Sequence, residues 1–242
     1  MFSWEGLAII LALCSILSVL SYRFGLLTSS GAMASFAVGM LIGVLGSIEW
    51  LFLLIVFTFL GFFVTKFRMQ VKQKKGLQEG RRGERTYKNV LANGLVPALV
   101  AIVSFAYGEQ DSMLANIAYI SAVAVAASDT TASELGVLDP DVRLITTWER
   151  VPPGTDGGIS IQGTFWCIVA SVFASGIGWL VVYQRILDPL LIIPIAMGVF
   201  GCMADSVIGA TLERKHVVTK LGTNILSMVA GTLLAAAIYL AL

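Results

Sequence analysis

Three carboxylates lie near the ends of apolar segments that are long enough to cross a membrane. Asp129 and Glu134 bound the stretch 129–134, and Asp205 begins the stretch 205–210. About 100° of rotation per residue places Asp129, Ser133 and Glu134 in one sector of a helix, and Ser206 follows Asp205 directly. Carboxylates in such places are costly and usually face a cavity, a cation or a partner. Hard oxygen ligands of this kind suit Mg²⁺ held between a protein and substrate phosphates.

Neighbouring polar residues leave more than one role open. Either aspartate could instead form a structural ion pair with Arg143 or Lys220. Asn93 and Asn224 lie within apolar segments, where an amide makes either a hydrogen bond between helices or a contact to a substrate. The sequence alone supports both interpretations.

A polar, turn-rich segment, residues 137–163, is longer than a minimal connection between two helices needs. Loops of this length are usually functional. Its glycines allow successive N–H groups to converge on an anion, and Thr155, Ser160 and Thr164 could donate hydroxyl groups. The segment ends where the next helix should begin, and a helix N-terminus favours a phosphate. No Gly-Lys-Ser/Thr follows the glycines, so this is not a Walker A loop, and a flexible linker is the alternative.

The composition indicates an integral membrane protein. Of the 242 residues, 57% are hydrophobic and 13% are charged, whereas a soluble domain has about 25% charged residues. Apolar runs of roughly 18 to 22 residues match the thickness of the hydrocarbon core, so we expect an all-α fold, a polytopic transmembrane helix bundle of about seven or eight spans. Residues 1–242 should form a single membrane domain. The expected spans are residues 4–22, 25–45, 48–65, 90–107, 113–131, 164–183, 189–210 and 221–242.

The basic residues set the expected orientation. With eight alternating spans, 15 of the 16 Lys and Arg residues fall on one side and only Arg185 falls on the other. The positive-inside rule makes the basic side cytoplasmic, with loops at residues 66–89, 137–163 and 211–220. The segment 66–88 carries nine basic residues against Glu79 and Glu84. It either fixes the topology through anionic lipid headgroups or recruits a polyanion such as a nucleotide or lipid phosphate. Because the basic residues are confined to a few loops, we expect no nucleic acid as a partner.

Four blocks of the chain together resemble the integral-membrane phytyl-phosphate kinase family, which includes plastid and prokaryotic proteins and an animal transmembrane relative. The blocks are Val90–Gly94, Ser128–Gly136, Val151–Thr164 and Ala204–Thr211. The family is distantly similar to the dolichol and phytol kinases, which use CTP. The resemblance implies phosphoryl transfer from a nucleoside triphosphate, CTP by this similarity, to an isoprenyl monophosphate such as phytyl phosphate. The diphosphate product would feed tocopherol or phylloquinone synthesis. The chain has no evident transit peptide, which fits a bacterial protein of the inner or a photosynthetic membrane.

The resemblance also implies roles for individual residues. Phosphoryl transfer mainly requires a protein to position phosphates and to neutralise charge. We expect Asp129, Glu134 and Asp205 to be catalytic and to bind one or two Mg²⁺ ions. The residues expected to bind the nucleotide and substrate phosphates are Gly154, Thr155, Gly157, Gly158, Ser160, Gly163, Thr164, Lys66, Lys72, Arg85, Arg143 and Lys220. The residues expected to contact the substrate are Asn93, Ser133, Ser206 and Asn224. The isoprenoid tail would lie between spans among membrane lipids, along the small-residue surface of residues 25–45.

A transporter or flippase for an anionic lipid or metabolite is the alternative function. In that case the acidic residues would bind a coupling cation and the polar loop would move. Transporters tend to bind their substrates near the bilayer midplane. Because Asp129 and Asp205 lie near the expected cytoplasmic surface, the sequence favours an enzyme at the membrane interface.

Overall fold

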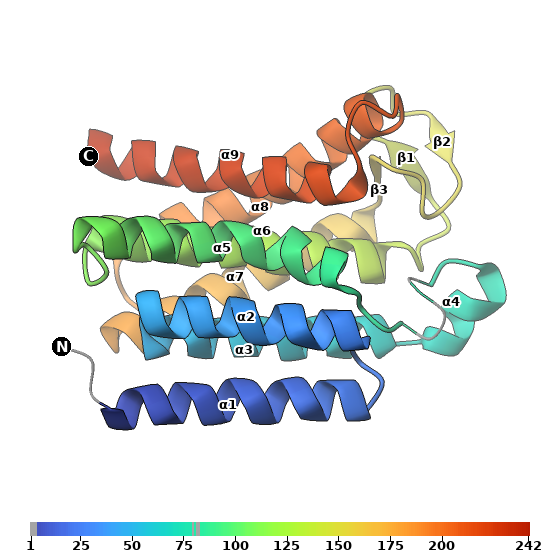
Figure 1. The fold of residues 1–242 in the computed structure, drawn as a ribbon. Coiled ribbons are helices and arrows are strands. Elements are labelled where there is room, and N and C mark those ends of the chain that lie inside the picture. Colours follow the sequence, from blue (N-terminus) through green and yellow to red (C-terminus); the bar gives the residue numbers. More distant parts are fainter. Residues whose placement is uncertain (1–3, 79, 81–82) are drawn as a thin grey trace.

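The computed structural model describes residues 4–78, 80 and 83–242, which form a bundle of long helices with a small sheet at one end (Figure 1). The helices are α1 (Trp4–Arg23), α2 (Ser29–Leu45), α3 (Ile48–Lys66), α4 (Met69–Lys75), α5 (Tyr87–Tyr107), α6 (Met113–Gly136), α7 (Ile161–Tyr183), α8 (Ile192–Ile208) and α9 (Lys220–Ala241). The short 3₁₀-helix η1 (Pro189–Leu191) precedes α8, and the π-helical turn η2 (Gly209–Glu213) follows it. Within the described residues, seven helical segments are long and apolar enough to cross a membrane, and α2 is a shorter apolar helix of 17 residues. The predicted all-α transmembrane bundle is therefore confirmed.

Two predicted loops contain regular structure. Strands β1 (Val142–Leu144), β2 (Arg150–Val151) and β3 (Gly158–Ile159) form an antiparallel sheet in the order β2-β1-β3 within residues 137–163. Strands of two or three residues are too short to produce the alternating pattern by which a strand is predicted. Residues 66–89 contain the seven-residue helix α4. Glu79, which the sequence placed in this basic segment, lies outside the described residues.

Helix α6 lies at the centre of the bundle, where α3, α5, α7, α8 and α9 pack around it. Of its most apolar 18-residue window 83% is buried, against 17–44% for the other long spans. The helix is rich in alanine and serine, and small residues allow helices to approach closely in a membrane. Residues on α6 are therefore held by contacts on all sides.

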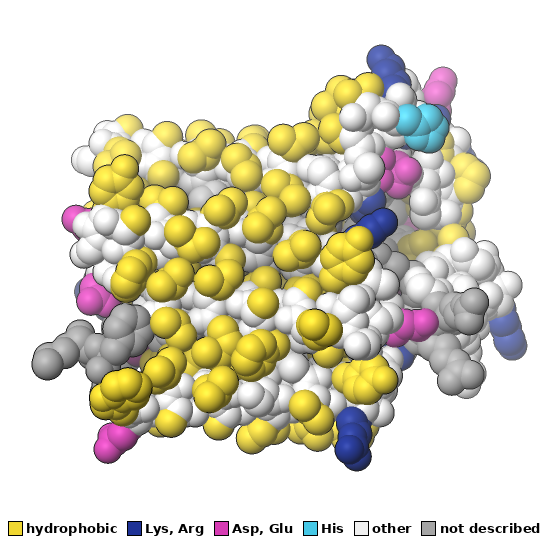
Figure 2. Space-filling view, viewed as in Figure 1, with side chains coloured by type: hydrophobic (Ala, Val, Ile, Leu, Met, Phe, Trp, Pro, Cys, Tyr) yellow, Lys and Arg dark blue, Asp and Glu magenta, His cyan; other side chains and the backbone are white. Residues whose placement is uncertain are grey.

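The two ends of the bundle differ in charge. The start of α1 and the end of α9 lie at one end, and α4 and the sheet lie at the other (Figure 1). On the face shown in Figure 2, hydrophobic side chains cover the helices, and most visible Lys and Arg side chains gather at the end with α4 and the sheet. We call this second end the basic end, formed by residues 66–78, 80, 83–89, 137–163 and 209–220. The start of α1 and the end of α9 thus lie opposite the basic end.

Candidate active site

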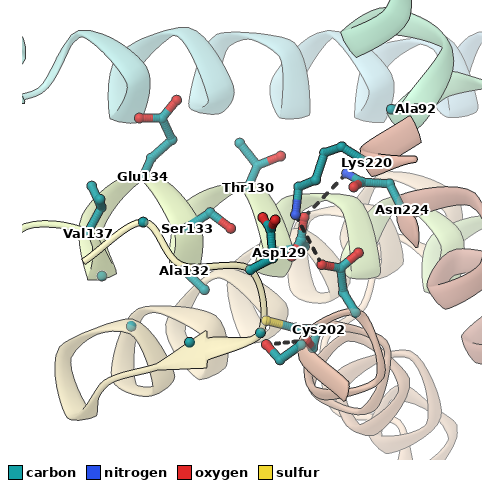
Figure 3. Close-up of a pocket in the computed structure, with 18 of the residues that line it drawn as sticks. Ala92, Asp129, Thr130, Ala132, Ser133, Glu134, Val137, Cys202, Lys220 and Asn224 are labelled. Atoms are coloured by element: carbon teal, nitrogen blue, oxygen red, sulfur yellow. Dashed lines mark hydrogen bonds and ion pairs between the residues drawn. The ribbon is translucent and has the colours of Figure 1, made fainter. Parts of the chain in front are cut away.

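A cavity of about 770 Å³ opens at the basic end between α5, α6, α8, α9 and the glycine-rich loop that follows β2 (Figure 3). It is lined by every predicted site residue except Lys66, Lys72 and Arg143. The chain thus gathers, in one space, side chains that lie more than 100 positions apart in the sequence.

Close packing of α6 against α8 brings Asp129 and Asp205 to the same cavity. The two helices run in the same direction, toward the basic end (Figure 1). A side-chain carbon on Gly201 would lie 2.5 Å from both methyl groups of Val125, so only glycine allows this approach. Val125 and Gly201 each lie about one helical turn before an aspartate, because a turn takes about 3.6 residues. The contact therefore places the two aspartates at matching heights.

One face of α9 contacts both aspartates. Asp129 and Asp205 are only 8% and 4% exposed. Asn224 Nδ2 donates to Asp129 Oδ2 at 3.4 Å, and Lys220 Nζ lies 3.4 Å from Asp205 Oδ1. The hydroxyl of Ser227 lies 3.3 Å from Asp205 Oδ2. The alternative ion pair between an aspartate and Lys220 is therefore present at Asp205, while both aspartates still line the cavity.

The oxygen atoms in this part of the cavity suit a hard cation. Asn224 Oδ1 is buried and has no hydrogen-bond partner among the described residues. The two carboxylates fit Mg²⁺, which proteins usually bind through one or two carboxylates together with water and substrate phosphates. Over residues 4–78, 80 and 83–242, no three His, Cys, Asp or Glu side chains are grouped so as to hold a metal ion by themselves.

Glu134 is directed away from the two aspartates (Figure 3). Its Oε2 lies 2.6 Å from Lys72 Nζ, and its Oε1 accepts a hydrogen bond of 2.8 Å from Thr65 Oγ1. Lys72 is fully buried and also donates to the carbonyls of Val64 and Thr65. Arg85 Nη2 donates to Thr65 Oγ1 at 2.9 Å. The structure therefore does not group Glu134 with the aspartates, and it places Lys72 in a buried ion pair instead of at the cavity surface.

The other predicted cations are divided between the cavity and the surface. Arg85 and Lys220 line the cavity, and Lys66 does not. Arg143 lies on β1, where its guanidinium is 3.8 Å from Asp141. Arg150 Nε donates to the same carboxylate at 2.8 Å, and this hydrogen bond lowers the pKa of Asp141 from its usual value. These two arginines thus stabilise the sheet instead of reaching the aspartates of the cavity.

The glycine-rich loop packs directly on the turn that follows α8. Gly154 and Gly157 have positive φ, a conformation that glycine adopts without strain. A side-chain carbon on Gly157 would lie 2.4 Å from the backbone nitrogen of Ala210, so the two backbones are in contact. Thr155 N donates to Pro152 O and Gly158 N to Thr155 O. The N–H groups of Asp156 and Gly157, between them, have no partner in the described part of the chain, which leaves two donors for an anion.

The start of α7 already has its own hydrogen-bond acceptors. Ser160 Oγ caps the helix by accepting from Gly163 N at 3.0 Å, and Asp139 Oδ2 accepts from Gln162 N at 3.3 Å. Gly163 also packs against Gly136 of α6, because a side-chain carbon added to Gly136 would lie 2.9 Å from the Cα of Gly163. Ser160 and Gly163 line the cavity but have structural roles. The loop before them therefore offers a phosphate more unpaired N–H donors than the helix terminus does.

Comparisons with known proteins give the family. Residues 12–237 match the integral membrane protein family DUF92. The chain belongs to this family. An uncharacterized membrane protein of Methanocaldococcus jannaschii is 34% identical over 231 residues, covering 95% of this chain and 92% of that protein. Protein PGR of Arabidopsis thaliana is 30% identical, covering 87% of this chain and 83% of its own length. No solved structure matches.

A second plant protein of Arabidopsis thaliana, the chloroplastic protein VTE6, is also similar to this DUF92 chain. It is 28% identical over 207 residues, which cover 84% of this chain and 61% of VTE6. This similarity and the family match confirm the resemblance to the phytyl-phosphate kinase family that the four sequence blocks indicated.

Several residues that line the cavity of this DUF92 protein were not predicted from its sequence. Lys88 and Asn89 belong to the first turn of α5, and Asp156 belongs to the glycine-rich loop. Ser227 touches Asp205 from α9. Its spacing of three residues from Asn224, in the same helix, places both side chains on one face and could have revealed it. Lys88 is the last basic residue of the segment 66–88, but its place in the cavity depends on how α5 packs.

Proposed function

We propose that this protein transfers a phosphoryl group from a nucleoside triphosphate to an isoprenyl monophosphate such as phytyl phosphate. CTP is the first candidate for the donor. The observation that carries the proposal is the meeting of all four sequence blocks at one cavity. Ala92 and Asn93 come from the first block, Asp129 to Gly136 from the second, Gly154 to Thr164 from the third, and Asp205 and Ser206 from the fourth. The four blocks, which are separate in the sequence, thus line one cavity.

The charges around the cavity divide it into two parts. Arg85 and Lys88 lie on the side of α5, while Asp129 and Asp205 lie between α6, α8 and α9. The cationic side suits the phosphate of the acceptor, because guanidinium and ammonium groups bind phosphate oxygens strongly. The free N–H groups of Asp156 and the following glycine suit the phosphates of the donor.

We further propose that Asp129, Asp205 and Asn224 hold Mg²⁺ together with the donor phosphates. The ion, when bound, would neutralise the charge that develops on the transferred group. Lys220 lies beside Asp205 and can move its ammonium to a phosphate oxygen once the carboxylate has another cation. An acceptor phosphate that is already ionised needs no protein base. The assigned side chains therefore position charge and move no proton.

The basic end would face the cytoplasm, where nucleoside triphosphates are available, and the tail of the acceptor would lie among membrane lipids. The concentration of Lys and Arg at that end supports this orientation. The similarity to a chloroplastic protein supports phytyl phosphate as the first acceptor to test.

The decisive experiment measures diphosphate formation by the purified protein in liposomes. Phytyl, geranylgeranyl and farnesyl monophosphates are each combined with CTP, UTP, ATP or GTP, with and without Mg²⁺. We expect a Mg²⁺-dependent product that Asp129→Asn abolishes. Asp111→Asn is the matched control, since Asp111 is exposed at the opposite end of the bundle. Folded protein that forms no product with any pair would refute the kinase and favour transport of an anionic lipid, and full activity of Asp129→Asn would refute the metal assignment.

A further inference from the structure

A second, narrower cavity of about 50 Å³ lies between α2, α3 and α5. Most of its lining is apolar or small. The lining residues are Ser35, Val38, Leu54, Phe57, Thr58, Phe62, Arg85, Asn89, Val90, Asn93 and Gly94. We call this space the tail groove. Three of these residues, Arg85, Asn89 and Asn93, also line the main cavity, so the two spaces meet at a polar junction.

The junction contains buried polar atoms that have no partner. Arg85 is only 9% exposed, and its Nε finds no hydrogen-bond acceptor within the described residues. Asn93 is 8% exposed, and its Oδ1 is likewise without a donor in the part of the chain described. Buried polar groups are rarely left unpaired, because each costs free energy when it loses water. A ligand that brings an anionic group to this junction would pair with the guanidinium.

The guanidinium is held in place by the protein. Arg85 Nη2 donates to Thr65 Oγ1 at 2.9 Å, and the backbone of Arg85 forms hydrogen bonds with Leu26 and Thr28 before α2. A side-chain carbon on Gly61 would lie 3.0 Å from Nη1, so the absence of a side chain on α3 makes room for this group. A fixed guanidinium at the mouth of an apolar groove matches an amphiphile with one phosphate and one hydrocarbon chain.

We propose that the tail groove receives the start of the hydrocarbon chain of a prenyl monophosphate, with its phosphate at Arg85 and the main cavity. This assignment rests on the proposed function and adds the site that recognises the acceptor. A volume of about 50 Å³ favours a lipid with a single chain over a diacyl phospholipid. Beyond the groove, the rest of a long tail continues between the spans into the bilayer.

Photoaffinity labelling tests the groove without relying on catalysis. The probe is a geranylgeranyl monophosphate with a diazirine on its second isoprene unit, used in liposomes containing the full chain. We expect labelled peptides from α2, α3 and α5 that include groove residues, with labelling suppressed by excess unlabelled phytyl monophosphate. Labelling spread over all lipid-facing helices, or without this competition, would overturn the proposal.

A pair of phenylalanine variants on α2 makes the test specific. Ser35→Phe places a ring in the groove, whereas Ala37→Phe places one on an exposed part of the same helix that does not line it. Ser35→Phe should lower groove labelling and raise the KM for the acceptor by about tenfold, because an added ring in a packed space must displace its neighbours. The KM for the nucleotide should not change, and Ala37→Phe should behave as wild type. Equal labelling of the two variants would contradict the groove.

Diphosphate formation is measured on the same preparations to separate the two proposals. Groove labelling without any product would refute the kinase and leave the groove standing. Product formation with labelling at another place would refute the groove and leave the kinase standing.

Discussion

The buried pair of Lys72 and Glu134 gives the sharpest test of what Glu134 does. In the ion pair, Glu134 holds the basic segment to α6 through Lys72. As a metal ligand, Glu134 would instead bind a cation that contacts a phosphate. Lys72→Met removes a 2.6 Å contact to a carboxylate and leaves the carbonyls of Val64 and Thr65 without this donor. Removing one partner of a buried ion pair costs about 3–5 kcal/mol, and we expect a loss of this size in the free energy of unfolding.

The double variant Lys72→Met/Glu134→Gln should recover most of this loss. Glutamine is neutral and can still accept the hydrogen bond from Thr65, and methionine fills the space of the lysine chain. Replacing both members of a buried pair is often nearly neutral, so we expect stability within about 1 kcal/mol of wild type. Lys75→Met, on an exposed position of α4, is the control and should change stability by no more than about 0.5 kcal/mol.

Unfolding in mixed SDS micelles measures stability, and diphosphate formation in liposomes measures activity. If Glu134 is an anchor, Glu134→Gln alone loses both stability and activity, and the double variant regains both. A double variant as stable as wild type but inactive would refute this reasoning and return Glu134 to the phosphate site. Lys72→Met with unchanged stability would show that the pair contributes nothing.

Two further predictions concern helix packing and the sheet. Gly201→Ala forces a carbon against Val125 and should lower the free energy of unfolding by about 1–3 kcal/mol. It should also remove most of the activity, as unfolding and product formation will measure. Gly176→Ala, whose added carbon meets no atom within 4 Å, should change neither stability nor activity. Arg150→Ala should raise the pKa of Asp141, which the guanidinium lowers in the wild type, and a ¹³C NMR titration of the carboxyl group checks this. Because that pKa is lowered on folding, the pair stabilises the sheet above the usual pKa of aspartate, and the effect disappears as the pH falls through the lowered value. An unchanged titration in the variant would contradict the role given to Arg150.

Composition and length predicted the spans because a bilayer sets a required helix length. The expected span at residues 48–65 differs from α3 by one residue, and the span at 113–131 is shorter than α6 by five. The apolar run stops at residue 131, but the helix continues through the polar residues of its own site up to Gly136. A hydropathy criterion cannot see this extension, because the last turns of α6 carry polar residues although they are largely buried.

The site was predictable only as far as local geometry determines it. The aspartates, Asn224 and Lys220 were found because polar residues in apolar segments are conspicuous, and these side chains do meet at one cavity. Glu134 was misleading, because five residues of helix turn it about 140° from Asp129. That angle leaves room for a different partner, and its partner Lys72 lies 62 positions away in the chain. Contacts at such separations depend on the tertiary fold and leave no local pattern.

The position of α6 explains how one cavity can serve a lipid and a nucleotide. One side of its last turns presents Asp129 to α8 and α9, where the oxygen atoms for a cation lie. The other side presents Glu134 to Thr65 of α3 and Lys72 of α4, and Thr65 also accepts a hydrogen bond from Arg85 at the mouth of the tail groove. Because α6 is the most buried span, neither side can shift without moving the other. Breaking the contacts of Glu134 should therefore alter the geometry at the aspartates, and the Lys72 and Glu134 variants measure that connection directly.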